Sequence, residues 1–164
     1  MLKFIKPDYK VNEYVENNYY GKFVLEPLER GFGTTMGNAL RRVMLSSLEG
    51  SAITDIKIEG VMHEFQKMDG VVEDVTEIIL NLKKLVLKNH SEQDQILHLK
   101  ADREGEVHAS DIDKNGEVEI VNPDLVIATI SAGASLDMTM TVSNGRGYVD
   151  GKVNAQAVKD VVGA

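Results

Sequence analysis

The chain has 164 residues, 43% of them hydrophobic and 27% charged, which are the proportions of a globular protein with a core of its own. Its 18 Lys and Arg against 26 Asp and Glu give a net charge of −8, which disfavours duplex DNA, because DNA binding needs cations that displace counterions from phosphates. The sequence has no cysteine and no apolar run of about 18 residues, which excludes disulfides, thiolate metal sites and a membrane-spanning helix and favours a cytoplasmic location.

The first thirty or so residues predict a β-hairpin. Residues 11–16 and 20–28 have the composition of two strands, which we expect to be joined at Asn17-Asn18 and closed by Pro27. A glycine-containing turn over residues 29–33 then leads out of the second strand and into a helix.

The predicted helix over residues 34–48 has signals at both ends and two different faces. Thr34 or Thr35 is expected to cap its start by accepting a backbone N–H, and Gly50 to provide a left-handed exit. One face is formed by residues at helical spacing that suit packing: Met36, Leu40, Val43, Met44 and Ser47. Turned away from this face is a stripe of two cations and a leucine, Arg41, Arg42 and Leu45. Such a stripe is as typical of a protein–protein hot spot as of a solvated helix face.

The rest of the chain predicts strands around one further helix. Residues 51–62 alternate as a strand, and a polar segment then ends at Gly70. Apolar residues recur every three or four positions over about residues 71–84, which predicts a second helix. From residue 95 onward the pattern is all-β, clearest over residues 136–142, and hairpin turns are expected at Asn115-Gly116 and Asn144-Gly145. The predicted fold class is α+β, with antiparallel strands and two main helices.

Residues that carry chemistry do not gather into a site in this sequence. No pair of the four histidines has the spacing of zinc ligands, so no metal is expected. His63-Glu64 is more typical of an exposed turn than of a catalytic pair, as are the acid pairs near residues 73 and 111. Residues 31–37 lack the lysine of a P-loop, although a helix start binds anions unaided. We expect no catalytic residue and no cofactor; a small hydrolase or anion-binding enzyme is the catalytic alternative.

Several blocks carry a resemblance to a known family, in the family's order. They are LEPLERGFGTTMGNALRRVMLSS at residues 25–47, GVMHEF at 60–65, residues 69–75 with 79–83, and GRGYV at 145–149. EIVNP at 119–123 fits as well. Together these blocks resemble the amino-terminal region of the bacterial DNA-directed RNA polymerase α subunit. The similarity extends over about residues 10–149, and four ordered blocks of this length are far more specific than a single glycine motif.

The resemblance implies a non-catalytic assembly scaffold for transcription. In that family the region dimerises with a second α subunit, and the dimer is the platform for the β and β′ subunits. By matching position, the implied β contacts are Arg41, Arg42, Leu45 and Ser46, and the implied β′ contacts are Lys83 and Val149. The implied dimer-packing residues are Phe32, Met36, Leu40 and Met44, and the implied turn glycines are Gly31, Gly33 and Gly37. Direct DNA binding and membrane contact are not expected of this region.

The resemblance also implies a division of the chain. Residues 1–50 correspond to the first part of a dimerisation subdomain, and residues 51–150 to an inserted β-rich subdomain that contains the helix near 71–84. Residues 151–164 correspond to an incomplete return to the dimerisation subdomain, with the family pattern expected to fade after Val149. A truncated fragment or short paralogue that holds one large subunit as a decoy is the alternative function.

Overall fold

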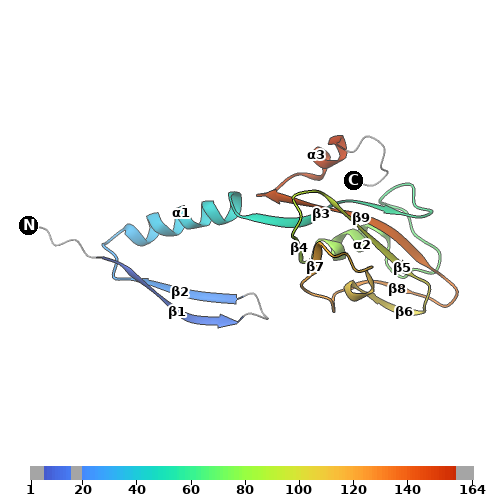
Figure 1. Cartoon of the computed structure of the whole chain (residues 1–164), viewed down its shortest axis with the longest axis horizontal. Coiled ribbons are helices and arrows are strands. Elements are labelled where there is room, and N and C mark those ends of the chain that lie inside the picture. The colour runs from blue at the N-terminus through green and yellow to red at the C-terminus, as the bar shows by residue number, and fades with distance from the viewer. Residues whose placement is uncertain (1–5, 16–19, 158–164) are drawn as a thin grey trace, which may run out of the picture. The chain divides into compact units, whose positions relative to one another are not determined.

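The computed structural model describes residues 6–15 and 20–157 and divides into two compact units, Met1–Ser47 and Leu48–Ala164. Within the described residues, the first unit holds two strands and a helix, and the second holds the remaining strands and helices (Figure 1). All strand pairs in these residues are antiparallel, so the predicted α+β class is confirmed. Every helix in the same ranges is too short or too polar to cross a lipid bilayer.

In the first unit, β1 (Asp8–Val15) and β2 (Tyr20–Glu26) pair as the predicted hairpin. The strand β2 ends at Glu26 rather than at residue 28, because Pro27 has no backbone N–H for the strand ladder. The expected joint at Asn17-Asn18 lies outside the described residues.

Helix α1 (Phe32–Ser46) starts earlier than predicted and ends differently. Gly31 takes a φ of 90°, a left-handed conformation that glycine reaches without a Cβ clash, and the helix begins directly after it. No side chain caps this end, so the predicted cap at Thr34 or Thr35 is wrong. At the other end the backbone N–H of Ser47 donates to the carbonyl of Val43 at 2.9 Å. Gly50 lies in the next strand, so the predicted left-handed exit there is also wrong.

In the second unit, the described residues form a five-stranded sheet and a separate two-stranded sheet. The larger sheet has the order β5-β9-β3-β4-β7, with β3 at Glu49–Ile58, β4 at Leu87–Asn89, β5 at Gln95–Ala101, β7 at Val118–Ile120 and β9 at Leu136–Arg146. The smaller sheet pairs β6 (Gly105–His108) with β8 (Val126–Ile130), and the 3-10 turn η2 (Ala109–Asp111) follows β6. Helix α2 (Val75–Leu82) packs against β8, and α3 (Gly151–Ala157), which was not predicted, packs against β3.

The strand β9, which lies between β5 and β3, supplies one side of the core of this unit. Its alternate residues are all buried, as the period-two pattern over residues 136–142 predicted: Leu136, Met138, Met140 and Val142. They pack in one cluster with buried side chains from β3, β5 and α2, among them Ile56, Leu99 and Ile78. Because this cluster joins strands far apart in the sequence, it defines the second unit.

The two expected hairpin turns are not formed. Asn144 and Gly145 continue β9, where they pair with Ser51 and Gly50 of β3. The hydroxyl of Ser51 donates to Oδ1 of Asn144 at 2.7 Å, so a partner distant in sequence overrides the local turn preference. Asn115-Gly116 lies in the bend before β7, but β7 pairs with β4 rather than with a strand next to it in sequence.

Helix α2 is shorter than the predicted 71–84 because Asp74 caps it. Oδ1 of Asp74 accepts the backbone N–H of Glu77 at 2.7 Å, and Oε2 of Glu77 accepts the N–H of Asp74 at 3.2 Å, which is a capping box. Upstream, Glu73 accepts from the N–H and the hydroxyl of Thr129 at 2.6 and 2.9 Å. Val71 forms an isolated β-bridge to Ile130. The first residue of the predicted apolar repeat therefore contacts a strand, and the helix begins only after it.

Two glycines with almost the same φ angle provide a test of this packing. Gly70 and Gly60 have φ of 78° and 79°, but a Cβ on Gly70 would overlap the Cβ of Ala134, whereas a Cβ on Gly60 would meet nothing within 4 Å. We expect Gly60→Ala to cost about 1 kcal/mol from backbone strain and Gly70→Ala about 2–4 kcal/mol, because the overlap adds to the same strain. Urea unfolding followed by circular dichroism measures both, and equal losses would contradict the packing argument.

A second prediction concerns acid stability. Asp111 accepts the backbone N–H of His108 at 2.8 Å and both carboxylate oxygens meet the guanidinium of Arg103, and these contacts hold the pKa of Asp111 below its ordinary value. A lowered pKa in the folded state adds stability that is complete above the unfolded-state pKa of about 3.9 and is lost as the pH falls through the folded-state pKa.

We therefore expect Asp111→Asn to lower the free energy of unfolding by about 1–2 kcal/mol at pH 7. The difference in this free energy between variant and parent should become smaller as the pH falls below about 4. Urea titrations at pH 7 and near pH 3 measure it, with Asp113→Asn as the control on an exposed neighbour. A difference that does not change with pH would contradict the assignment.

Candidate protein-interaction surfaces

The residues considered for catalysis do not form an active site in this structure. His63 and Glu64 lie exposed in a turn after β3, and the carboxylates Glu73, Asp74 and Asp111 are engaged in the structural bonds described above. Residues 31–37 form the N-cap and first turns of α1. In the part of the chain that the structure describes, no group of three or more His, Asp and Glu side chains is placed to hold a metal ion.

The four implied β contacts lie together on α1, and we call them the arginine patch: Arg41, Arg42, Leu45 and Ser46. Residues three and four apart are neighbours on a helix surface, so these four side chains form one continuous patch. All four are exposed. The hydroxyl of Ser46 donates to the carbonyl of Arg42 at 2.6 Å, which directs it back onto the helix.

The guanidinium groups of the arginine patch have no polar side-chain partner within the described residues. Neither Arg41 nor Arg42 forms an ion pair or a side-chain hydrogen bond with any residue that the structure describes. Arg146, by contrast, pairs with Glu49 across the end of β9 and β3, and that guanidinium holds the pKa of Glu49 below its ordinary value. Two adjacent free guanidinium groups leave planar donor arrays available for a carboxylate or carbonyl.

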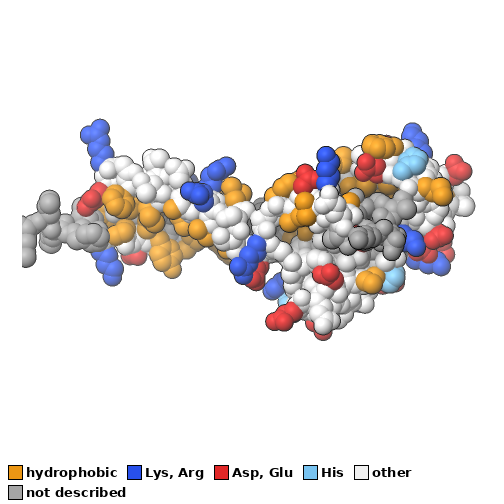
Figure 2. Space-filling model, turned by 90° about the horizontal axis from the view of Figure 1, so that it is seen from above, with side chains coloured by type: hydrophobic (Ala, Val, Ile, Leu, Met, Phe, Trp, Pro, Cys, Tyr) orange, Lys and Arg blue, Asp and Glu red, His pale blue; other side chains and the backbone are white. Residues whose placement is uncertain are grey.

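The opposite side of the same helix is the apolar face of α1: Phe32, Met36, Leu40, Val43 and Met44. None of these side chains is buried, and Leu40 remains 52% exposed. The hairpin adds exposed aromatic side chains, among them Tyr14 and Phe23, and Figure 2 shows hydrophobic side chains gathered over the first unit. An apolar helix face of this width is normally covered, so this unit has the properties of an incomplete core.

The turn glycines are placed differently from one another. Gly31 makes the left-handed turn before α1. Gly33 and Gly37 lie inside α1 rather than in a turn, and a Cβ on either would meet nothing within 4 Å. Within the described residues, no other element therefore approaches the helix at these glycines.

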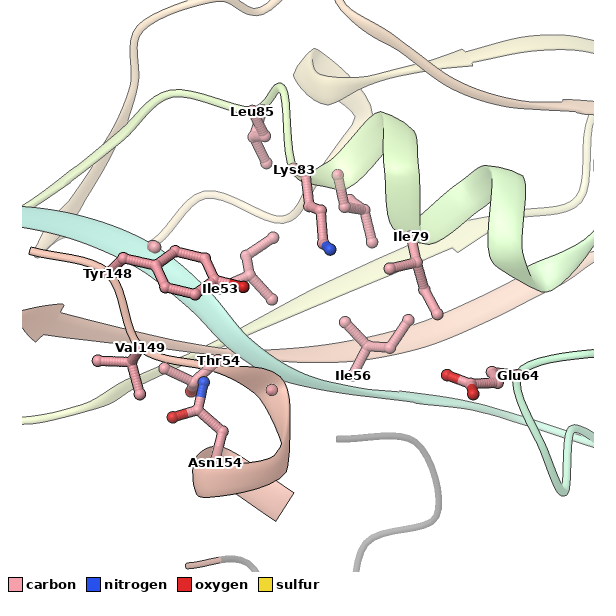
Figure 3. A pocket seen from close by; sticks show the side chains of 13 residues that line it. Ile53, Thr54, Ile56, Glu64, Ile79, Lys83, Leu85, Tyr148, Val149 and Asn154 are labelled. Carbon is pink, nitrogen blue, oxygen red and sulfur yellow. The ribbon is translucent and has the colours of Figure 1, made fainter.

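The implied β′ contacts, Lys83 and Val149, are far apart in the sequence but line one cavity of about 350 Å³ in the second unit, which we call the β3 groove (Figure 3). The strand β3 contributes Ala52, Ile53, Thr54 and Ile56, and α2 with the turn after it contributes Ile79, Leu82, Lys83 and Leu85. The segment after β9 contributes Tyr148, Val149, Gly151 and Asn154, and Glu64 completes the lining. The groove is therefore mainly apolar, with one cation and one carboxylate.

A β-bulge in β3, which the sequence did not predict, shapes this groove. Ile53 pairs with Val142 and Asp55 with Thr141, so Thr54 is an extra residue on one strand. The buried carboxylate of Asp55 accepts from the hydroxyls of Thr141 at 2.8 Å and Thr54 at 3.1 Å. The only sequence signal was the polar pair Thr54-Asp55, which interrupts an otherwise alternating strand.

An α+β fold with an uncovered apolar helix face, free arginines and an apolar groove is typical of a subunit that works through contacts with other chains. The model of the RNA polymerase Rpb3/RpoA insert domain family matches residues 56–163, and the chain belongs to this family. The match continues well past Val149, so the expectation that the family pattern fades there was wrong.

Curated relatives confirm the resemblance to the polymerase α subunit. The chain is 56% identical to the DNA-directed RNA polymerase subunit alpha of Carboxydothermus hydrogenoformans over 154 residues, which are 94% of this chain and 49% of the relative. It is 55% identical to that of Symbiobacterium thermophilum over the same shares, and 54% identical to that of Oenococcus oeni over 94% of this chain and 48% of the relative. The chain spans about half the length of the curated relatives it matches.

If the Val149 side chain serves contact with a partner rather than folding, truncating it to alanine will change the free energy of unfolding very little. Val149 is 49% exposed, whereas Val142 of β9 is 0% exposed, so the same truncation at the two sites compares surface with core. We expect Val149→Ala to change the free energy of unfolding by less than about 0.5 kcal/mol and Val142→Ala to lower it by about 2 kcal/mol. Urea unfolding measures both, and a comparable loss at Val149 would show that it serves the fold.

Proposed function

We propose that this chain works as a non-catalytic assembly scaffold of a bacterial RNA polymerase, dimerising through its first unit and recruiting the β and β′ subunits. The observation that carries the proposal is the division of α1 into two opposite exposed faces, one apolar and one with free guanidinium groups. A helix of this kind serves two interfaces at once. Family membership and the names of the relatives support the same role.

In this proposal the apolar face of α1 packs against a second copy of the chain. Phe32, Met36, Leu40 and Met44 are all exposed and lie on one side of the helix. Burial of large apolar side chains stabilises an interface by roughly 25 cal/mol per Å². A second copy supplies an apolar surface of the same kind, and two such faces together complete the core that one chain leaves open.

The arginine patch then faces the β subunit, because it is turned away from the dimer-packing side. Arg42 and Leu45 provide a planar cation beside an exposed apolar side chain, a combination typical of residues that dominate protein–protein affinity. Lys83 and Val149, in the β3 groove of the second unit, are the proposed contacts with β′. The net charge of −8 supports an assembly role without direct contact between this region and DNA.

Substitutions of two leucines in the same helix, Leu40 and Leu45, test the two proposed interfaces independently. Leu40 and Leu45 are 52% and 60% exposed, so a change to aspartate at either position does not open the core of the second unit. We expect Leu40→Asp to abolish dimerisation, because it would bury a carboxylate in an apolar interface at a cost of several kcal/mol. We expect Leu45→Asp and Arg42→Ala to leave the dimer intact and to weaken capture of β by about tenfold or more.

Light scattering coupled to size-exclusion chromatography measures the first effect, and co-purification with co-expressed β and β′ measures the second. Arg30→Ala, an exposed arginine before α1, is the control for loss of charge. Equal β capture by Arg42→Ala and the parent would contradict the assignment of the arginine patch. A parent chain that is monomeric but still captures β would contradict the scaffold and match a decoy.

A further inference from the structure

The strand β3 has an unpaired edge within the described residues. It lies between β9 and β4 in the sheet, but β4 meets it only where Ser51 pairs with Leu87. From Ala52 to Lys57 the β4 side of the strand has no strand partner among these residues, whereas the other side pairs with β9. An extended strand presents backbone N–H and C=O groups on such an edge, and they are a template for another strand.

The β3 groove lies against this same stretch of strand. Ala52, Ile53, Thr54 and Ile56 all line it, so the cavity runs along the same stretch of β3 whose β4 side has no strand partner among the described residues. Six residues of strand span about 20 Å at roughly 3.3 Å per residue, which is enough for a short segment to pair. Opposite the strand, Ile79 of α2 offers an apolar wall.

Lys83 and Glu64 are the charged residues that line the groove, and neither forms an ion pair within the described residues. Lys83 ends α2 and its ammonium group points into the cavity (Figure 3), and it forms no ion pair with the residues that the structure describes. Glu64 lies beyond Ile56 and Ile79 in the same view, away from Lys83. An occupant is therefore favoured if it brings a carboxylate to the Lys83 end and apolar side chains to the isoleucines between.

We infer that the β3 groove binds an extended segment of a partner polypeptide, which joins β3 as an additional strand. The segment presents apolar side chains at alternate positions and an acidic residue that pairs with Lys83. Backbone hydrogen bonds to residues 52–57 supply affinity, while the cavity and Lys83 select the side chains. The identity of the partner as β′ rests on the function proposed above, but the mode of binding does not.

The test uses two hexapeptides that carry fluorescein on the amino terminus, Asp-Thr-Val-Thr-Ile-Thr-amide and the same sequence reversed, which cover both strand directions. Binding to the full chain is measured by fluorescence anisotropy, and hydrogen exchange reports protection of residues 52–57. We expect one peptide to bind, its Asp→Lys variant to bind at least about fivefold more weakly, and methylation of alternate backbone nitrogens to reduce affinity about tenfold.

Protein variants complete the test. Lys83→Ala is expected to weaken the aspartate peptide about fivefold, whereas Lys84→Ala, the adjacent exposed lysine that does not line the groove, is expected to leave affinity unchanged. Both substitutions lie on an exposed turn, and circular dichroism checks that the fold is kept.

Each other outcome overturns the inference. Binding that ignores both backbone methylation and Lys83→Ala would be unspecific apolar association. Self-association that protects residues 52–57 would assign the groove to a second copy of the chain. Failure of both peptides to bind at millimolar concentration, while β′ still co-purifies in a Lys83-dependent manner, would exclude strand addition and leave the proposed function standing.

Discussion

The pairing of β3 with β9 is the contact on which the second unit depends. It joins residues that are 97 positions apart at one end, where Glu49 lies opposite Arg146, and 80 apart at the other, where Ile58 lies opposite Met138. Its buried side contributes Met138, Met140 and Ile56 to the core. Pairing strands that are distant in sequence costs conformational entropy, and burial of the apolar side of the sheet offsets this cost. The strict alternation along β9 provides that apolar side and so makes the pairing stable.

The same pairing also determines where the candidate surface lies. The bulge at Thr54 shifts the register of β3 relative to β9, and β4 reaches β3 only at Ser51. Within the described residues, the strand thus pairs along its length with β9 on one side and has no strand partner beyond Ser51 on the other. A rigid sheet that supports an open edge is a suitable arrangement for recognition, since the fold already holds the strand in its extended conformation.

The first unit differs from the second in how little of its apolar surface is buried. A two-stranded hairpin and a single helix bury too little apolar surface for independent stability, and every side chain of α1 is at least partly exposed. The second unit, by contrast, has a closed core. In the proposed assembly, contact with a partner would complete the apolar packing of the first unit, whereas the second unit has its own core without a partner.

Local chemistry in the sequence determined the hairpin, the two faces of α1 and the alternation of β9, because these depend on residues within one or two turns or strand repeats of each other. The family resemblance, and with it the candidate contact residues Arg42 and Lys83, was also legible from the sequence. The roles of Gly50, Asn144 and Val71 were not, since each has a strong local preference that a distant strand partner overrides. Only the tertiary structure brought Lys83 and Val149 to one groove and left the edge of β3 open, because that depends on register, and register is set by the packing of the whole sheet.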